Sequence, residues 1–146
     1  MSIPIPDPVP RAPSVGAARL HLVQQPSPVP GSIDGAWWPR SRILVEELPG
    51  IVIALREMRS LRIARMSYNP ELWVPTPNRV FADGHVIRLG WFASIDPHIM
   101  TLAAADSDQR VALHVIPPDT TGAHASKIMA RVAQTGDAPP SAATRL

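Results

Sequence analysis

The chain of 146 residues contains no cysteine. It can therefore form no disulfide, no iron–sulfur cluster, no cysteine-ligated zinc site and no thiolate nucleophile. It also lacks any apolar run near the ~20 residues that span a bilayer. Its start, "MSIPIPDPVPRAP", has neither the charged nor the apolar region of a secretory signal. Together these absences predict a cytoplasmic protein without a membrane segment.

A large excess of charge is also missing, because 14 basic and 12 acidic residues leave a net charge of +2. Lys127 is the only lysine, so nearly all the positive charge is arginine. This bias is typical of a GC-rich genome, and it also suits bidentate contacts to anions. Because phosphate binding normally requires a dense basic surface, the overall charge predicts that nucleic acid is not a partner.

Signatures of cofactor chemistry are absent as well. The sequence has no Gly-rich phosphate loop, no G-x-S-x-G nucleophile elbow and no H-E-x-x-H zinc motif. His21, His85, His114 and His124 do not have the spacing of metal ligands. We therefore expect no cofactor and no metal, and we favour a non-enzymatic role over an enzymatic one.

Proline, by contrast, is abundant, with 18 residues that are unevenly placed. Residues 1–17 form a Pro-rich segment that predicts an extended, disordered arm, and residues 137–146 predict a second disordered tail. The intervening residues 18–136 suit one domain. The overall composition, 45% hydrophobic and 18% charged, is that of a globular protein.

The periodicity of apolar residues predicts the elements of this domain. Residues 19–24 alternate as a strand does, whereas apolar residues recur at helical spacing after Ser41, a candidate N-cap. Pro49 should kink or split this helix. Four further strand candidates cover 62–68, 79–92 with a hairpin turn at Asp83-Gly84, 98–105 and 110–116.

A final helix is predicted after a cap at Asp119 or Thr120, with an apolar stripe that includes Ala125 and Val132. The predicted order is strand, helix, four strands, helix. We therefore expect an α+β fold in which an antiparallel sheet of about five strands carries both helices on one face.

The tryptophans in "DGAWWPRS" (34–41) are the first candidates for a site. If this stretch is extended, Trp37 and Trp38 point to opposite sides, so one ring enters the core. The other, beside Arg40, could serve as a platform for a planar or cationic ligand. Alternatively, both rings cover the edge of the sheet and the start of the helix.

The stretch "RLGWFASIDPH" (88–98) is the second candidate. Gly90 would let a large ring approach the strand, and Trp38 or Trp91 could be that ring. Asp96 and His98 lie two residues apart on a rigid turn, where they could act as an acid–base pair. The alternative is an Asx turn, in which Asp96 only accepts hydrogen bonds from local backbone N–H groups.

Further candidates are Tyr68 and a cluster of basic side chains. Tyr68 could be a structural hydrogen-bonding anchor, which is the usual role, or a contact to a ligand. The cluster could bind an anion or an RNA backbone, or its side chains could cover a solvated edge. It consists of Arg56, Arg59, Arg62 and Arg65.

The words "DGAWWPRSR", "YNPELW", "RLGWF" followed by "DPH", and "VIPPDT", in this order, resemble a family of small actinobacterial proteins known as domain of unknown function 5994. The similarity extends from about Arg19 to about Val132. The resemblance implies a high-GC bacterial source, and it implies no activity, ligand or catalytic residue.

Three functions are therefore compatible with the sequence. The first is a binding or regulatory module that takes a small molecule or a protein in a cleft built from aromatic and polar residues. These residues are Trp37 or Trp38, Arg40, Tyr68, Trp91, Asp96 and His98. The second is a small enzyme that uses His98 with Asp96 as its acid–base pair and Arg40 as an anion clamp. The third and weakest is anion or RNA binding by the basic cluster.

Overall fold

The computed structural model describes residues 18–23 and 33–135. The arm and the tail predicted at 1–17 and 137–146 lie outside the described residues. In chain order the elements are β1 (Leu20–Leu22), β2 (Gly35–Trp37), α1 (Leu44–Arg59), β3 (Ile63–Tyr68), the 3₁₀ turn η1 (Pro70–Leu72), β4 (Arg79–Ala82), β5 (His85–Trp91), β6 (Ile99–Ala104), β7 (Arg110–Val115) and α2 (Gly122–Thr135).

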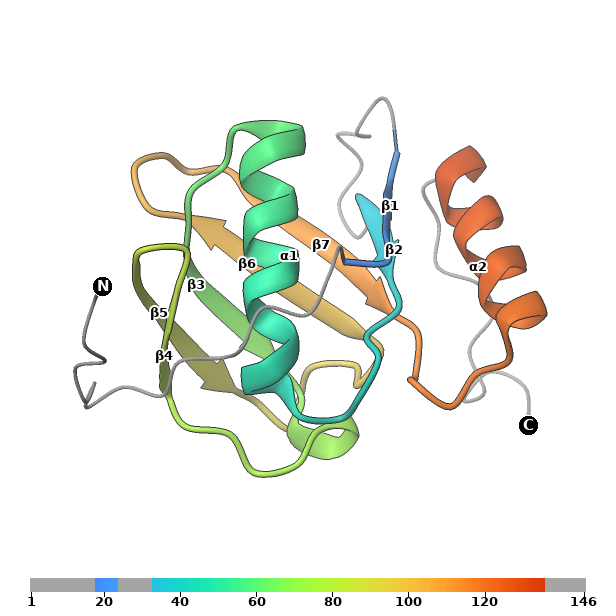
Figure 1. Cartoon of the computed structure of the whole chain (residues 1–146), viewed down its shortest axis with the longest axis horizontal. Coiled ribbons are helices and arrows are strands. Elements are labelled where there is room, and N and C mark those ends of the chain that lie inside the picture. The colour runs from blue at the N-terminus through green and yellow to red at the C-terminus, as the bar shows by residue number, and fades with distance from the viewer. Residues whose placement is uncertain (1–17, 24–32, 136–146) are drawn as a thin grey trace, which may run out of the picture.

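The strands form one sheet in the order β1-β2-β7-β6-β3-β5-β4 (Figure 1). The α+β class is as predicted, but the antiparallel sheet of about five strands is wrong in two respects. The described strands number seven, and the pairs β2–β7 and β3–β5 are parallel. The three-residue strand β2 escaped prediction because it is too short to display alternation.

The predicted hairpin at Asp83-Gly84 is confirmed. It joins the antiparallel strands β4 and β5, and both turn residues have positive φ, 51° and 84°. This is the conformation of a two-residue type I′ turn, for which Asp-Gly is a preferred sequence.

Helix α1 begins at Leu44, later than the predicted N-cap at Ser41. The Ser41 hydroxyl instead donates to Glu47 (2.9 Å), whose carboxylate also accepts the Arg40 N–H (2.9 Å). Glu47 is buried in the first turn, where a carboxylate interacts favourably with the helix dipole. The helix then continues through Pro49 as one element, so the predicted split does not occur.

The start of α2 also differs by one residue from the prediction. The hydroxyl of Thr121, rather than Asp119 or Thr120, accepts a backbone N–H from the first turn, that of His124 (3.2 Å).

The two helices lie on opposite faces of the sheet, which corrects the expectation that both cover one face. Trp37 and Leu113 pack in the same core as the apolar residues of α1. The neighbouring residue Ala36 packs with Ala125 and Val132 of α2 in a second core. Because successive residues of a strand face opposite sides, this division assigns α1 and α2 to different faces.

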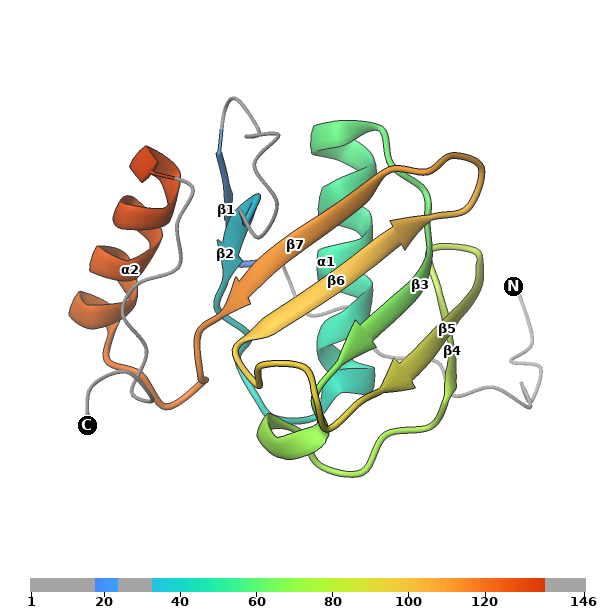
Figure 2. The same cartoon turned by 180° about the vertical axis from the view of Figure 1, so that it is seen from behind.

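Helix α2 covers only the end of its face near β1 and β2 (Figure 1). Viewed from behind, β7, β6, β3 and β5 have no helix in front of them (Figure 2). We call this uncovered side of β7, β6, β3, β5 and β4, opposite α1, the open face.

Gly35 allows β1 and β2 to pair closely, and its replacement by alanine tests this contact. A Cβ on Gly35 would lie 2.4 Å from the backbone oxygen of His21, so the strands would have to separate. We expect Gly35→Ala to lower the free energy of unfolding in urea by about 1 to 3 kcal/mol.

The matched control is Gly50→Ala in α1, where a Cβ would meet Ala18 at an ordinary contact distance of 3.6 Å. Alanine is the better helix former, so this variant should gain roughly 0.5 to 1 kcal/mol. Equal unfolding midpoints for Gly35→Ala and the wild-type protein would contradict the close approach.

Candidate functional site

The two adjacent tryptophans face opposite sides, as predicted. Trp37 is 1% exposed and stacks on Trp73 in the α1 core, with ring centroids 5.7 Å apart. Trp38 is half-buried against the α2 core. The Arg19 guanidinium lies 3.7 Å from the centroid of the Trp38 ring. The cation that stacks on this ring is therefore a side chain of the same chain.

The other members of the predicted cleft are spread over the molecule. Tyr68 is buried in the α1 core, and burial raises the pKa of its phenol. Arg40 is exposed at the junction between β2 and α1. Trp91 is 60% exposed at the end of β5 and is paired in register with Tyr68. The structure therefore does not bring Trp38, Arg40, Tyr68 and Trp91 together around one cleft.

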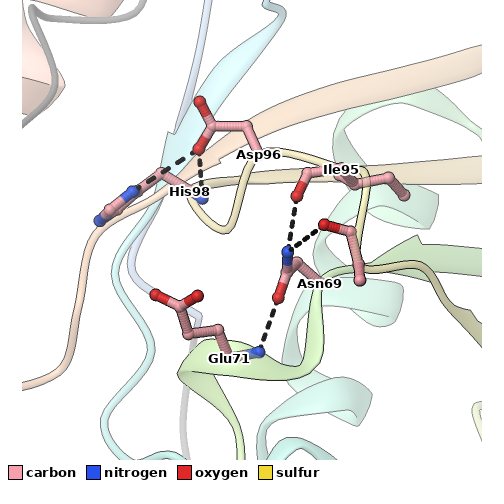
Figure 3. Close-up of polar contacts among 6 residues, drawn as sticks. Asn69, Glu71, Ile95, Asp96 and His98 are labelled. Atoms are coloured by element: carbon pink, nitrogen blue, oxygen red, sulfur yellow. Dashed lines mark hydrogen bonds and ion pairs between the residues drawn. The ribbon is translucent and has the colours of Figure 1, made fainter. Parts of the chain in front are cut away.

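Asp96 and His98 form a turn that is closed by a hydrogen bond from the His98 backbone to the Asp96 side chain (Figure 3). One Asp96 carboxylate oxygen, Oδ1, accepts the His98 backbone N–H at 2.8 Å, whereas the His98 ring nitrogen Nδ1 is 3.7 Å from it. The second distance exceeds that of a hydrogen bond. In this geometry the Asp96 carboxylate fixes the conformation of the turn and does not orient the His98 imidazole.

The loop before Asp96 is fixed by the buried side chain of Asn69 (Figure 3). Its amide nitrogen donates to the carbonyls of Ala93 (3.3 Å) and Ile95 (2.7 Å). Its oxygen accepts the Glu71 N–H at 2.8 Å. Asn69 thus ties η1 to the loop between β5 and β6, a structural role for the "YNPEL" sequence.

His98 stacks on a second histidine that the sequence did not single out, His114 of β7. The ring centroids are 5.8 Å apart and the planes are inclined by 13°. His114 is 4% exposed, and its Nδ1 has no hydrogen-bond partner among the described residues. Burial, with a smaller contribution from the nearby His98, lowers the pKa of His114 to about 4. The His114 imidazole is therefore neutral at neutral pH.

The predicted basic cluster is divided by the fold. Arg56 pairs with Asp83 at 2.7 Å, and Arg59 donates to the carbonyl of Val23. Arg62 is exposed just before β3. Only Arg65 of this cluster is a strand residue on the open face.

Arg65 belongs instead to a line of four arginines across the sheet. At one end of the line, Arg110 of β7 and Arg65 of β3 are both opposite Ala103 of β6, which lies between them. The line continues from Arg65 to Arg88 of β5, its partner in register. It ends at Arg79 of β4, which is opposite Arg88. Their strand neighbours pack in the α1 core, so all four arginines project from the open face. We call Arg110, Arg65, Arg88 and Arg79 the arginine row.

No carboxylate forms an ion pair with this row among the described residues. All four side chains are exposed, and none makes an ion pair or hydrogen bond within the described part of the chain. Strands β3 to β7 contain no aspartate or glutamate. Neighbouring strands are about 4.8 Å apart, so a row across five strands spans about 19 Å.

A pocket of about 320 Å³ opens at one end of the row, between Arg110 and Arg65. The small side chain of Ala103 lies between these arginines, and Asp108 and Gln109 of the β6–β7 loop contribute polar groups. Ligand pockets in proteins usually measure about 300 to 1,000 Å³, so this pocket is at the lower limit of that range.

An exposed aromatic ring flanks the row on the same face. A Cβ on Gly90 would lie 3.3 Å from the Phe92 ring, which therefore covers Gly90 on the open side. The ring that approaches this glycine is thus Phe92, and the expectation of Trp38 or Trp91 was wrong. Phe92 is 50% exposed.

Three members of the row, Arg79, Arg88 and Arg110, were not among the predicted site residues. Each occupies a polar position in an alternating strand, which indicates that it faces away from the core. The alternation of polar and apolar residues within one strand cannot reveal, however, that the four arginines lie in one line. Their alignment depends on the parallel pairing of β3 with β5 and on the register of five strands.

Among the described residues, no group of three or more side chains is arranged to hold a metal ion. Neither α1 nor α2 combines the length and apolarity of a membrane-crossing helix. A family model described as "Family of unknown function (DUF5994)" matches residues 19–132. No curated protein and no solved structure matches the chain.

Proposed function

The chain belongs to DUF5994, a family of unknown function, and from its own residues we propose that it is a binding module whose open face takes an anionic ligand. The observation that carries this proposal is the arginine row, with four unpaired cations in register on one uncovered surface. Arginine presents a planar set of donors that matches carboxylate and phosphate groups.

The energetics of the sheet support this assignment. Like charges directly opposite each other on neighbouring strands destabilise a sheet, by roughly 0.2 to 1 kcal/mol per pair. Arg65 opposite Arg88 and Arg88 opposite Arg79 are two such pairs in the strand register. An anion bound between the arginines would attract each of them and offset their mutual repulsion. The row therefore favours the protein with an anion bound.

A binding role is also better supported than acid–base catalysis at Asp96 and His98. The Asp96 carboxylate already accepts the backbone N–H of His98, and the imidazole stacks on His114. Tyr68, another residue of the predicted cleft, packs in the α1 core.

Isothermal titration calorimetry with sodium tripolyphosphate at low ionic strength tests the proposal. We expect the wild-type protein to bind, and Arg65→Gln/Arg88→Gln to bind about 100-fold more weakly or worse, because it loses two charged hydrogen bonds of about 1.5 kcal/mol or more each. The variant should fold at least as stably as the wild-type protein, since it removes a like-charge pair.

The matched control is Arg40→Gln/Lys127→Gln, which removes the same two charges from exposed positions outside the row. It should retain the wild-type affinity. If both double variants lose affinity equally, the binding reflects net charge alone. If the wild-type protein does not bind tripolyphosphate, the proposal is wrong.

A further inference from the structure

We infer that the anion on the open face is a single-stranded nucleic acid, whose phosphates follow the arginine row while a base stacks on Phe92. This inference rests on the proposed anion-binding function and names its ligand. Three features of the face carry it: the length of the row, the position of the aromatic ring, and the polar groups of the pocket.

The length of the row favours a chain of phosphates over a single one. Arg110 and Arg65 flank the pocket, but Arg88 and Arg79 continue the same line for two more strands, or about 10 Å. A compact anion in the pocket would leave these last two arginines unused. A strand of nucleic acid that crosses the sheet would contact all four.

The space beside the row is suited to a sugar and a base. Next to the arginine row lies a parallel row of small residues, which are Thr101, Ser67 and Gly90 on the open face and Ala112 where the row meets the α2 core. Gly90 is two residues from Arg88, and the Phe92 ring lies over it, so an exposed aromatic face is about 7 Å from the row. One nucleotide covers such a distance between its phosphate and its base.

This arrangement selects a single strand over a duplex. A base can stack on a protein ring only when its face is free, which it is in a single strand and not in a double helix. Sheets that bind single-stranded RNA use exposed aromatic side chains on an open face in this way.

The pocket favours a nucleotide over an inorganic polyanion. Asp108 and Gln109 line it beside Arg65 and Arg110. The single Asp108 carboxylate weakens the attraction of the four arginines for a ligand that carries only negative charge, without reversing it. The carboxylate can accept hydrogen bonds from the amino groups of a base or from a ribose hydroxyl.

The small net charge of +2 does not oppose this inference, although it led us to expect no nucleic acid partner. Charges beyond about 8 Å are screened at physiological ionic strength, so a strand on the open face experiences mainly the arginine row. One carboxylate, that of Asp108, lines the pocket at the end of the row, and Asp83 is paired with Arg56.

Fluorescence anisotropy with a labelled oligouridine of about 12 nucleotides, a length within the range of single-strand sites, tests the ligand. We expect binding whose log K falls with log salt with a slope of about −0.7 per phosphate, or near −3 for four contacts. Arg65→Gln/Arg88→Gln should reduce the magnitude of this slope by about half.

Phe92→Leu separates nucleic acid from other anions. It should weaken oligouridine binding by about tenfold or more and leave tripolyphosphate binding unchanged, because only the oligonucleotide has a base to stack. Phe92→Tyr should restore the affinity for oligouridine. The matched control is Trp91→Leu, which removes an exposed ring paired in register with Tyr68, and it should bind as the wild-type protein does.

Each alternative outcome overturns a defined part of the inference. If tripolyphosphate binds and oligouridine does not, or if Phe92→Leu binds oligouridine normally, the nucleic acid assignment fails and the anion site stands. Equal affinity for an RNA duplex of the same length would exclude selection of single strands. If neither probe binds, both the inference and the proposed function fail.

Discussion

Replacement of Trp37 by alanine should lower the free energy of unfolding by about 3 to 5 kcal/mol. The Trp37 ring is fully buried between α1 and the sheet, and it stacks on Trp73, so its removal leaves a cavity and an unpaired ring. Small domains have a total stability of only about 5 to 15 kcal/mol. Urea unfolding followed by circular dichroism measures the loss.

Trp38→Ala is the matched control for this prediction. Trp38 is only half-buried, and its main specific contact is the Arg19 guanidinium over its ring, so we expect a loss of about 1 to 2 kcal/mol. Trp37→Phe should recover much of the stability, because it keeps a ring against Trp73. Equal losses at Trp37 and Trp38 would contradict their assignment to different cores.

The second large effect concerns His114 and acid. In the unfolded chain its pKa is near 6.5, and in the folded protein it is about 4, so between these values the unfolded state binds more protons. The contribution of the neutral His114 to the free energy of unfolding is therefore fully present above pH 6.5, decreases as the pH falls and is lost below pH 4. At about 1.4 kcal/mol per pH unit, the loss is about 3 kcal/mol.

Unfolding free energies of the wild-type protein and of His114→Gln, measured from pH 7 to pH 4, isolate this contribution. The variant should lose about 3 kcal/mol less than the wild-type protein over this range, whatever its stability at pH 7. The control His124→Gln changes an exposed residue of α2 and should follow the wild-type curve. Parallel curves for the wild-type protein and His114→Gln would refute the prediction.

The elements that the sequence predicted correctly are those with local signals. The Asp83-Gly84 turn, the alternating strands and the apolar stripe of α1 each depend on neighbours within a few residues. The separation of Trp37 from Trp38 followed from strand alternation alone. What these signals do not contain is the pairing of strands that are distant in the chain.

The incorrect predictions all depend on this pairing of distant strands. Helix α2 covers the opposite face from α1 because β2 pairs with β7, and no local pattern specifies that partner. The basic cluster was predicted from sequence proximity, whereas the fold joins Arg65 to Arg110, Arg88 and Arg79 through strand register. The buried His114 was overlooked because burial at the α2 side depends on the same pairing.

The pairing of β2 with β7 also determines when the protein can fold during synthesis. Asp34, just before β2, accepts the backbone N–H of Ala112, 78 residues later in the chain, at 2.8 Å. A ribosome adds about 5 to 20 residues per second, so β2 waits roughly 4 to 16 s for its partner strand. During that interval β2 has only β1 to pair with, and the strand on its other side is missing. The N-terminal strands therefore reach their final place in the sheet only after β7 has been synthesised.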